Sequence, residues 1–214
     1  KALDDEIRKI IEEEIRKALI FVIVNSLLFI ATTYLINPLC LALSPVALLV
    51  ILGYSYTKRF TALCHLVLGL GLALAPIGAY LAVSGEFNII PLLFSAAVLF
   101  WVSGFDIIYS LQDEEFDKEQ KLHSIPVLIG KKNALMLSNV LHLLTFSSLS
   151  IAGSLGEFGL YYWIGFWIFS ALLVYQHTLV KHNDLSKINL AFFTTNGIAS
   201  VIFGAFVIAD LLFK

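Results

Sequence analysis

The sequence predicts an all-α fold, a polytopic transmembrane helical bundle of about seven spans that follows an N-terminal amphipathic helix. Hydrophobic residues make up 59% of the 214 residues and charged residues only 14%, and the mean hydropathy is +0.88. Because a typical soluble domain carries about 25% charged residues, too few charges are left here for a polar surface. The formal net charge of −2 and the lack of a basic, aromatic-rich patch predict no nucleic-acid partner.

The first 17 residues are expected to form an amphipathic helix that lies at the membrane interface or against the other helices. Its apolar residues recur at helical spacing and are surrounded by Asp, Glu, Lys and Arg. The apolar stripe consists of Leu3, Ile7, Ile10, Ile11, Ile15 and Ala18. The segment lacks the pattern of a removable signal peptide, and its repetitive Ile, Glu, Arg and Lys composition indicates an idealised or grafted helix. We therefore expect two parts, residues 1–17 and a transmembrane bundle over residues 18–214.

Seven apolar segments follow, each near the length of about 20 residues that crosses a bilayer. They are Ala18–Ile36, Leu39–Gly53, Leu63–Val83, Ile89–Tyr109, Ala134–Ile151, Phe158–Val180 and Leu190–Leu212. Pro38 marks a turn after the first segment, so the first two are expected to form a tight helical hairpin. Pro76 is expected to kink the third, because proline removes a backbone hydrogen bond.

Positive charges alternate between the connections, which predicts the orientation in the membrane. Outside the N-terminal segment they occur in three alternate connections, as Lys58 and Arg59, then Lys118, Lys121, Lys131 and Lys132, then Lys181 and Lys187. The intervening turns contain no Lys or Arg. Every positive charge except Lys214 is therefore expected on one face, taken as cytoplasmic, in an inner or plasma membrane.

The stretch Phe105–Asp117 begins in an apolar segment and ends in a cluster of carboxylates. If the helix continues through it, four residues share one face, namely Asp106, Tyr109, Asp113 and Asp117. Asp113 and Asp117 would then lie about 6 Å apart along the axis, close enough to bind one divalent cation or two bridged by a diphosphate. The alternative is a solvated acidic helix end. The deeper position of Asp106 argues against it, because a buried carboxylate is costly unless it is paired.

The basic residues at the same rim suit a ligand with an anionic head and an apolar tail. Mg²⁺ usually bridges carboxylates to substrate phosphates. Four basic side chains could bind the remaining phosphate charge: Lys58, Arg59, Lys118 and Lys121. Arg59 is the best candidate, because its guanidinium can hold a phosphate or carboxylate in bidentate fashion. The alternative for the lysines is the positive-inside pattern alone.

Three motifs resemble, in family order, those of the UbiA superfamily of intramembrane aromatic prenyltransferases. Tyr54-x-Tyr56-x-Lys58-Arg59-Phe60-Thr61 resembles the basic motif that opens an earlier helix. Gly104-Phe105-Asp106-Ile107-Ile108-Tyr109 with Gln112-Asp113-x-x-x-Asp117 resembles the helix that carries the second aspartate-rich motif. Leu122-His123-Ser124-Ile125-Pro126 with Gly130 resembles the loop that follows. The resemblance extends from about Ala18 to the C-terminus and is strongest to the 4-hydroxybenzoate polyprenyltransferase branch, with the related menaquinone-pathway enzymes.

The resemblance implies transfer of a polyprenyl group from its diphosphate to an aromatic acid, in ubiquinone or menaquinone synthesis. It implies a Mg²⁺ cofactor held by Asp113 and Asp117, which would draw charge off the leaving diphosphate. Tyr109 would stabilise an allylic cation with its ring or support a metal ligand, and Asp106 would orient the acceptor or take its proton. Lipid, a prenyl diphosphate and an aromatic acid are the implied partners.

The same resemblance implies substrate-binding roles for the basic motif and for the loop after the acidic helix. Lys58 or Arg59 would hold a phosphate or the acceptor carboxylate. The loop would close over the head group through Lys118, Lys121, His123 and Ser124.

The sequence also departs from the family pattern, which has about nine spans and a first motif of the form N/D-D-x-x-D-x-x-x-D. Leu3-Asp4-Asp5-Glu6-Ile7 is a faint echo of that motif, but Arg8 and Lys9 spoil its spacing. We therefore expect a partial or rebuilt chain with weak or no prenyl transfer. Two alternatives from other classes are a redesigned, non-catalytic membrane scaffold and a transporter. A transporter would place acidic residues near the membrane midplane and show corresponding half-repeats.

Overall fold

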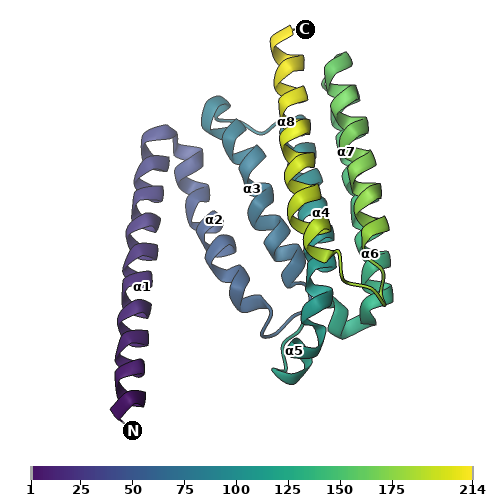
Figure 1. Cartoon of the computed structure of the whole chain (residues 1–214). Helices are drawn as coiled ribbons and strands as arrows, with labels where there is room; N and C mark the ends of the chain where they lie inside the picture. The colour runs from purple at the N-terminus through teal and green to yellow at the C-terminus, as the bar shows by residue number, and fades with distance from the viewer. Residues whose placement is uncertain (1, 214) are drawn as a thin grey trace.

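A computed structural model gives the protein as a bundle of long helices, without a β-strand in the part of the chain that it describes (Figure 1). It describes the backbone of residues 2–213 and the side chains of residues 6–213. The side chains of Leu3, Asp4 and Asp5 and the terminal Lys214 lie outside the described part. The elements are α1 (Ala2–Ile36), α2 (Pro38–Thr57), α3 (Cys64–Ser84), α4 (Ile89–Ser110), η1 (Leu111–Asp113), α5 (Glu114–Glu119), α6 (Ile125–Leu155), α7 (Leu160–Leu179), η2 (Leu190–Thr195) and α8 (Asn196–Phe213).

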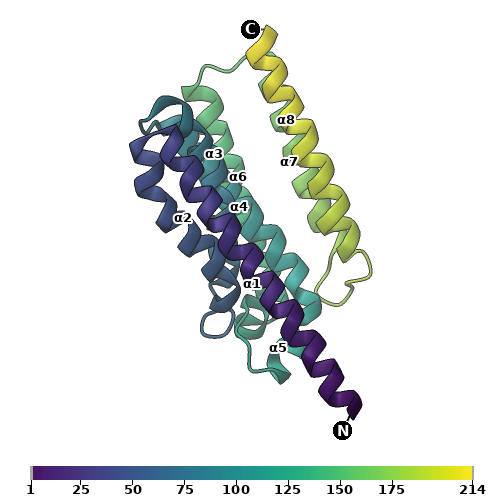
Figure 2. The ribbon, with the colours of Figure 1, turned by 90° about the vertical axis from the view of Figure 1, so that its left-hand side faces the viewer.

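The predicted amphipathic helix and the first predicted span are one continuous helix, α1. No Gly or Pro occurs before Pro38, so nothing in the local sequence stops the helix between residues 17 and 18. Asn37 ends it: this residue precedes a proline, adopts an extended conformation, and accepts a hydrogen bond from the Cys40 amide at 2.8 Å. The N-terminal end of α1 extends beyond the other helices (Figure 2). The division at residue 17 stays a prediction, since no helix end marks it.

Six helices of the described chain are long and apolar enough to cross a membrane, which supports an integral membrane protein. They comprise α1 to α4, the last with its extension to Glu119, together with α6 and η2–α8. The predicted span that is not among these six is Phe158–Val180, which corresponds to α7, a helix of 20 residues. Tyr and Trp residues and the polar pair Gln176–His177 lower its hydropathy below that of the other six. About seven spans is therefore the right architecture, with α7 as the least apolar helix.

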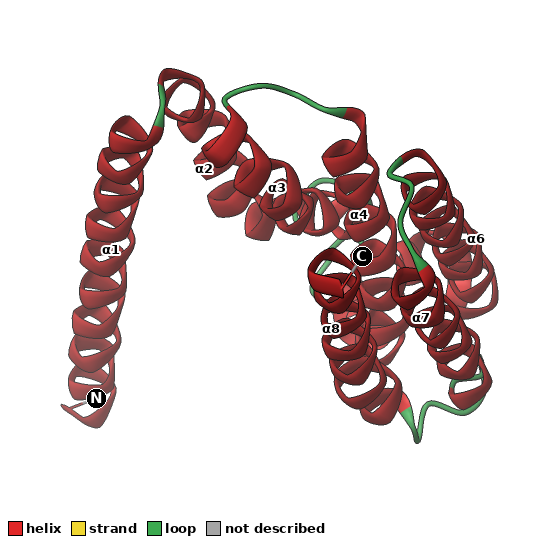
Figure 3. Ribbon diagram, turned by 90° about the horizontal axis from the view of Figure 1, so that it is seen from above, coloured by secondary structure: helices red, strands yellow, loops and turns green. Residues whose placement is uncertain are grey.

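The bundle is densest around α4, which packs between α3 and α6, while α7 packs against α8. Seen from above, α1 stands at one side and α4, α6, α7 and α8 are grouped at the other (Figure 3). Hydroxyl side chains join α4 to its neighbours: Ser138 donates to the Gly104 carbonyl at 2.7 Å, and Ser103 donates to the His65 carbonyl at 3.1 Å. Small residues and interhelical hydrogen bonds are the usual means of helix association in lipid.

Two glycines of α3 should respond in opposite ways to the same substitution. A Cβ on Gly69 would lie 2.5 Å from the Leu99 carbonyl oxygen and also collide with Ser103. Gly69→Ala is therefore expected to force α3 away from α4 and lower stability by about 2 kcal/mol. At Gly78 a Cβ would meet no described atom within 4 Å, so Gly78→Ala should be neutral or raise stability by up to about 1 kcal/mol. Thermal unfolding followed by circular dichroism in detergent compares the two, and equal effects would contradict the packing described.

Candidate active site at one end of the bundle

The acidic stretch does not continue as one regular α-helix, so the condition on which the predicted single face rested is not met. α4 ends at Ser110, and the tighter turn η1 precedes the short helix α5. A 3₁₀ turn advances the chain by three residues per turn rather than 3.6, which rotates the residues that follow away from their α-helical positions. As a result Asp117 is fully buried while Asp113 is half-buried. Asp113 still lies within electrostatic range of Lys58, Asp117 and Asp106.

Asp117 faces Lys58 rather than solvent. The Lys58 Nζ lies 2.9 Å from Asp117 Oδ1, and the carboxylate is 0% exposed. Neither carboxylate oxygen has a hydrogen bond of good geometry from any described residue, so the lysine supplies charge without satisfying the oxygens. The backbone fixes this meeting: the His123 amide donates to the Lys58 carbonyl at 2.7 Å, and the Leu122 amide donates to the Asp117 carbonyl at 2.8 Å. The loop after α5 therefore holds the end of α2 beside the acidic turn.

Asp106 is held by His65, a pairing that sequence spacing does not reveal because 41 residues separate the two. The His65 Nδ1 lies 2.7 Å from Asp106 Oδ2, and the Ile125 amide donates to His65 Nε2 at 3.4 Å. Since Nε2 accepts a hydrogen bond, the ring proton is on Nδ1 and is donated to Asp106. His65 is 3% exposed, whereas the Asp106 side chain is 23% exposed. Asp106 thus keeps one oxygen oriented by the bundle and one side open to a ligand.

Glu114 is an acidic residue of this region that the sequence analysis did not single out. Its carboxylate lies 2.5 Å from Lys118 Nζ and 3.7 Å from Lys131 Nζ. The pair with Lys118 joins the two ends of one helical turn, and Lys131 reaches it from α6. Lys118 is therefore already paired within α5.

The remaining predicted loop residues lie in different environments. Lys121 and His123 are exposed, and Lys121 has a positive φ of 55°. Ser124 is fully buried, and its hydroxyl has no hydrogen-bond partner among the described residues. Arg59 is exposed and lies over the ring of Tyr56, 5.3 Å from its centroid. The structure thus brings Lys58 to the acidic cluster but leaves Arg59 outside it.

Tyr109 lies between the acidic turn and an aromatic wall from the start of the last helix. Its ring is 4.1 Å from the ring of Phe192 and 5.9 Å from that of Phe193. These two phenylalanines are in η2, a π-helical turn, and such turns are frequent at functional sites. Asn196 closes the turn by donating to the Phe192 carbonyl at 2.8 Å while it accepts a hydrogen bond from Trp101 Nε1 at 3.1 Å.

A cavity of about 550 Å³ adjoins these rings. Its walls come from α3, α4, η2 and the start of α8, and they are mostly apolar. They include Leu72, Val98, Trp101, Phe105, Phe192 and Phe193. Two wall residues connect this groove to the charged cluster: Phe105 precedes Asp106 in the chain, and the Phe192 ring packs at a tilt on Tyr109. The arrangement suits a ligand with an anionic head and an apolar tail.

The carboxylates do not form a complete metal centre by themselves. Within the described side chains, no three His, Cys, Asp or Glu groups are placed to hold a metal ion. The donor set fits a Mg²⁺ ion that takes its other ligands from substrate phosphate and water, as Mg²⁺ usually does. The two buried Asp117 oxygens without hydrogen bonds and the half-open Asp113 are the groups that fit it.

Comparisons with known proteins give a family match and several relatives. The model of the UbiA prenyltransferase family matches residues 8–198. A 4-hydroxybenzoate octaprenyltransferase from Aeromonas hydrophila subsp. hydrophila is 31% identical over 172 residues, which are 80% of this chain and 60% of that protein. The enzyme of the same name from Francisella tularensis subsp. novicida is 32% identical over 170 residues, 78% of this chain and 59% of that protein. The chain therefore spans about 60% of the length of these relatives.

A solved structure, described as the apo structure of a UbiA homolog from Aeropyrum pernix K1, has the same fold. The TM-score is 0.82 at 30% sequence identity, and the match covers 92% of this chain and 73% of the other. The family match begins at residue 8, so it includes more than half of the charged segment that the sequence analysis set apart.

Proposed function

The chain belongs to the UbiA prenyltransferase family, and we propose on that premise that it takes part in transferring a polyprenyl group from its diphosphate to an aromatic acid in quinone synthesis. One observation carries the proposal: an open aromatic groove of about 550 Å³ is connected to the cluster of Asp106, Asp113, Asp117 and Lys58 by two groove residues, Phe105, which precedes Asp106 in the chain, and Phe192, which packs on Tyr109. A prenyl diphosphate has the same two parts, a charged head and an apolar tail. The names of the relatives favour 4-hydroxybenzoate as the acceptor, in ubiquinone rather than menaquinone synthesis.

The diphosphate would bind at Asp113, Asp117 and Lys58. Asp113 and Asp117 would hold Mg²⁺, which neutralises charge on the leaving diphosphate when it is bound. Lys58 is paired with Asp117 at 2.9 Å and 31% exposed, so it can turn toward a phosphate oxygen once a cation compensates the carboxylate. In this proposal Lys58 stabilises the acidic pair without ligand and binds phosphate with ligand.

The prenyl chain would lie in the aromatic cavity, with its first carbon near Tyr109. The Tyr109 ring is held by Phe192 and Phe193, so its face is fixed in position to stabilise positive charge on an allylic carbon. The apolar walls would also keep water from a reactive cation. These aromatic residues therefore bind the chain and protect the reacting end.

The aromatic acceptor would bind beside Asp106. Because His65 donates to Oδ2 at 2.7 Å, the other oxygen of Asp106 is free to accept the acceptor hydroxyl or its proton. Arg59 would hold the acceptor carboxylate, and this role requires the guanidinium to leave the Tyr56 ring that it now covers at 5.3 Å. Lys118, Lys121, His123 and Ser124 are proposed as a loop that closes over the head group, with Lys121 and His123 as its exposed members.

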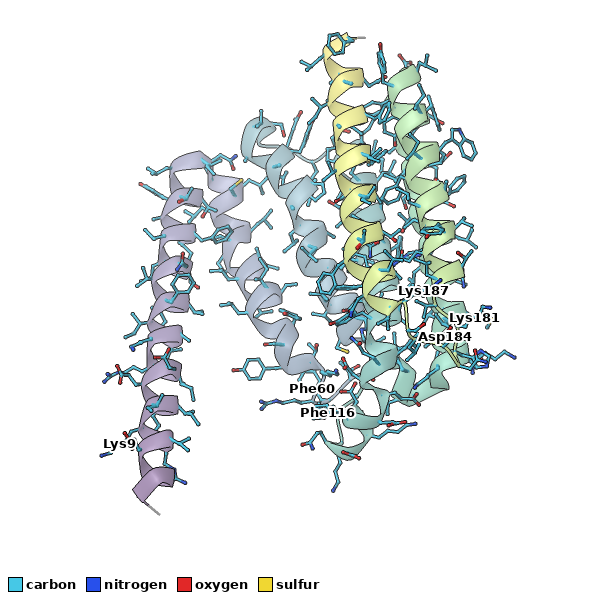
Figure 4. All side chains as sticks on the ribbon, viewed as in Figure 1. Lys9, Phe60, Phe116, Lys181, Asp184 and Lys187 are labelled. Atoms are coloured by element: carbon cyan, nitrogen blue, oxygen red, sulfur yellow. The ribbon has the colours of Figure 1, made fainter. Side chains whose placement is uncertain are left out.

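We also propose that the site faces the cytoplasm. Figure 4 shows three connections at the same end of the bundle, marked by Phe60, by Phe116, and by Lys181 and Lys187. Two more lysines lie at this end, because Lys58 pairs with Asp117 and Lys131 pairs with Glu114. Positive charge marks the cytoplasmic side of membrane proteins. Residues 6–17 are proposed to lie on this side of the membrane, since they continue α1 beyond the other helices and their side chains are exposed (Figure 2).

A titration with a non-hydrolysable prenyl thiodiphosphate tests the function. The purified chain is expected to bind farnesyl thiodiphosphate saturably with Mg²⁺, and at least about tenfold more weakly with EDTA, because the head carries several negative charges. Farnesol, which has the tail without the head, is the control for partition into detergent. The absence of Mg²⁺-dependent, saturable binding would favour the alternative of a non-catalytic scaffold.

A further inference from the structure

A second cavity lies between α6 and α7, and none of the residues that line it lines the groove of the proposed active site. Its volume is about 490 Å³, within the range of small-molecule sites. The two helices run side by side at the edge of the bundle (Figure 3). The lining residues are Asn139, His142, Leu143, Phe146, Trp167, Ser170, Ala171, Leu173, Val174 and His177. None of them is charged apart from the possible protonation of the two histidines.

The two histidines form one hydrogen-bonded unit at the end of this groove. His142 Nδ1 lies 2.8 Å from His177 Nε2, and His142 Nε2 lies 3.3 Å from the Trp101 carbonyl oxygen. His142 is 5% exposed. Gly104 lets the ring approach α4, because a Cβ there would lie 2.5 Å from two of its atoms. The position of His142 is therefore fixed by backbone on one side and by His177 on the other.

These contacts determine the direction of each hydrogen bond. A carbonyl oxygen only accepts, so His142 Nε2 carries a proton and donates it to Trp101. No carboxylate contacts either ring in the described side chains, so a neutral His142 leaves Nδ1 as an acceptor for the proton on His177 Nε2. A neutral His177 then has a lone pair on Nδ1. That atom has no described partner and is not among the fully enclosed polar atoms, and the His177 side chain lines the groove.

The other polar groups of the groove mainly add acceptors. The Ser170 hydroxyl donates its proton to the Phe166 carbonyl at 2.7 Å, which leaves its lone pairs available. Asn139 donates to the Leu135 carbonyl at 3.0 Å and keeps its amide oxygen and one N–H. A ligand that satisfies His177 and Ser170 must therefore be a hydrogen-bond donor. A quinone, ester or phosphate, which only accepts, does not meet this requirement.

We propose that this groove binds an uncharged, lipid-soluble phenol or alcohol whose O–H donates to Nδ1 of His177. The body of the ligand would lie against Leu143, Phe146, Trp167 and Val174, which form the rest of the wall. A phenol fits best, because its O–H is the stronger donor and its ring packs edge-to-face or offset against Phe146 and Trp167. The inference does not depend on the proposed prenyl transfer, since the two sites share no residue.

The competing outcome is that the groove holds the chains of an anionic lipid whose head group binds in a neighbouring pocket. This pocket has a volume of about 510 Å³, shares Asn139 with the groove, and is lined by Lys132, Lys181 and His182 among others. Anionic lipid head groups prefer basic pockets of this kind. If the groove held only the chains of such a lipid, the hydroxyl of a ligand would make no difference to its binding.

A matched pair of probes tests the proposal. The purified chain in an amine-oxide detergent, which has no O–H group, is titrated with para-trifluoromethylphenol and with para-trifluoromethylanisole, and binding is followed by fluorine NMR. The ether lacks the donor and carries one extra methyl group, so the affinity of each probe is corrected for its partition into detergent alone. The phenol is expected to bind saturably and about five- to tenfold more tightly than the ether, the value of one neutral hydrogen bond.

Variants identify the acceptor. His177→Phe should bring the phenol-to-ether ratio to about one, while His182→Phe, the same change in the basic pocket, should leave it unaltered. Val174→Phe fills the groove and should weaken both probes, and Ser170→Ala provides a milder second test if His177→Phe fails to fold. Equal binding of the two probes, or a phenol preference that persists in His177→Phe, would overturn the proposal. So would competition for the probe by phosphatidylglycerol that is lost in His182→Phe, or no saturable binding at all.

Discussion

Asp113→Asn is expected to weaken Mg²⁺-dependent binding of farnesyl thiodiphosphate by a factor on the order of 100. The half-buried Asp113 lies near Lys58, Asp117 and Asp106, and one unit charge a few ångströms from a bound cation contributes ~2–4 kcal/mol. Unlike Asp117, Asp113 is not the ion-pair partner of Lys58, so the change should leave the fold intact. Calorimetric titration in detergent at several Mg²⁺ concentrations measures the effect.

Glu115→Gln is the matched control, because it removes the same charge two residues away from an exposed side chain. It should change the affinity less than about twofold, since exposed charges are strongly screened. Similar losses in both variants would mean that binding depends on the overall acidity of α5 rather than on Asp113. Unchanged binding in Asp113→Asn would remove this residue from the proposed metal site.

Asp210→Ala is expected to lower the free energy of unfolding by about 3 kcal/mol, the largest stability effect that we anticipate. Asp210 is 1% exposed and accepts hydrogen bonds from the backbone amides of Gly159 at 2.7 Å and Tyr162 at 3.2 Å. A side chain of α8 thus caps the first turn of α7. Two hydrogen bonds to a charged group would be lost, each worth ~1.5 kcal/mol or more. Unfolding in a sodium dodecyl sulfate titration, followed by circular dichroism, gives the difference.

Two further variants define the cause. Asp210→Asn keeps one acceptor oxygen and should recover part of the loss. Glu86→Ala removes an exposed carboxylate in the connection between α3 and α4 and should change stability by less than about 0.5 kcal/mol. If Asp210→Ala unfolded no more easily than Glu86→Ala, the capping contact would not contribute to the association of α7 with α8.

The candidate site could be predicted only in part from the sequence. Tyr109, Asp113 and Asp117 stand out through their spacing in one acidic stretch, and Lys58 through its motif. Their actual arrangement depends on η1, where the chain tightens after Ser110 and buries Asp117. Helix periodicity carries no signal for such a break, since every residue of the stretch is compatible with an α-helix.

Hydrogen-bonded pairs whose two members lie far apart in the chain could not be predicted from spacing in the sequence. His65 stands at the start of an apolar segment, where its position near Arg59 favours a functional role, but only the structure identifies Asp106 as its partner, 2.7 Å away. His142 and His177 lie 35 residues apart and become a unit only when α6 and α7 come together. Conversely, Arg59 is prominent in its motif but lies over Tyr56, outside the acidic cluster.

The sequence alone determined that the chain is a membrane-embedded helical bundle and predicted its positive charges at one end. This follows from hydropathy and charge position, because each apolar segment must form its own backbone hydrogen bonds in lipid whatever its neighbours are. Only the tertiary structure decided which polar groups meet, as Lys58 does Asp117 and His65 does Asp106. Those pairs depend on how the helices rotate and pack against one another, and that is set by small steric contacts such as Gly69 and Gly104 that no local pattern encodes.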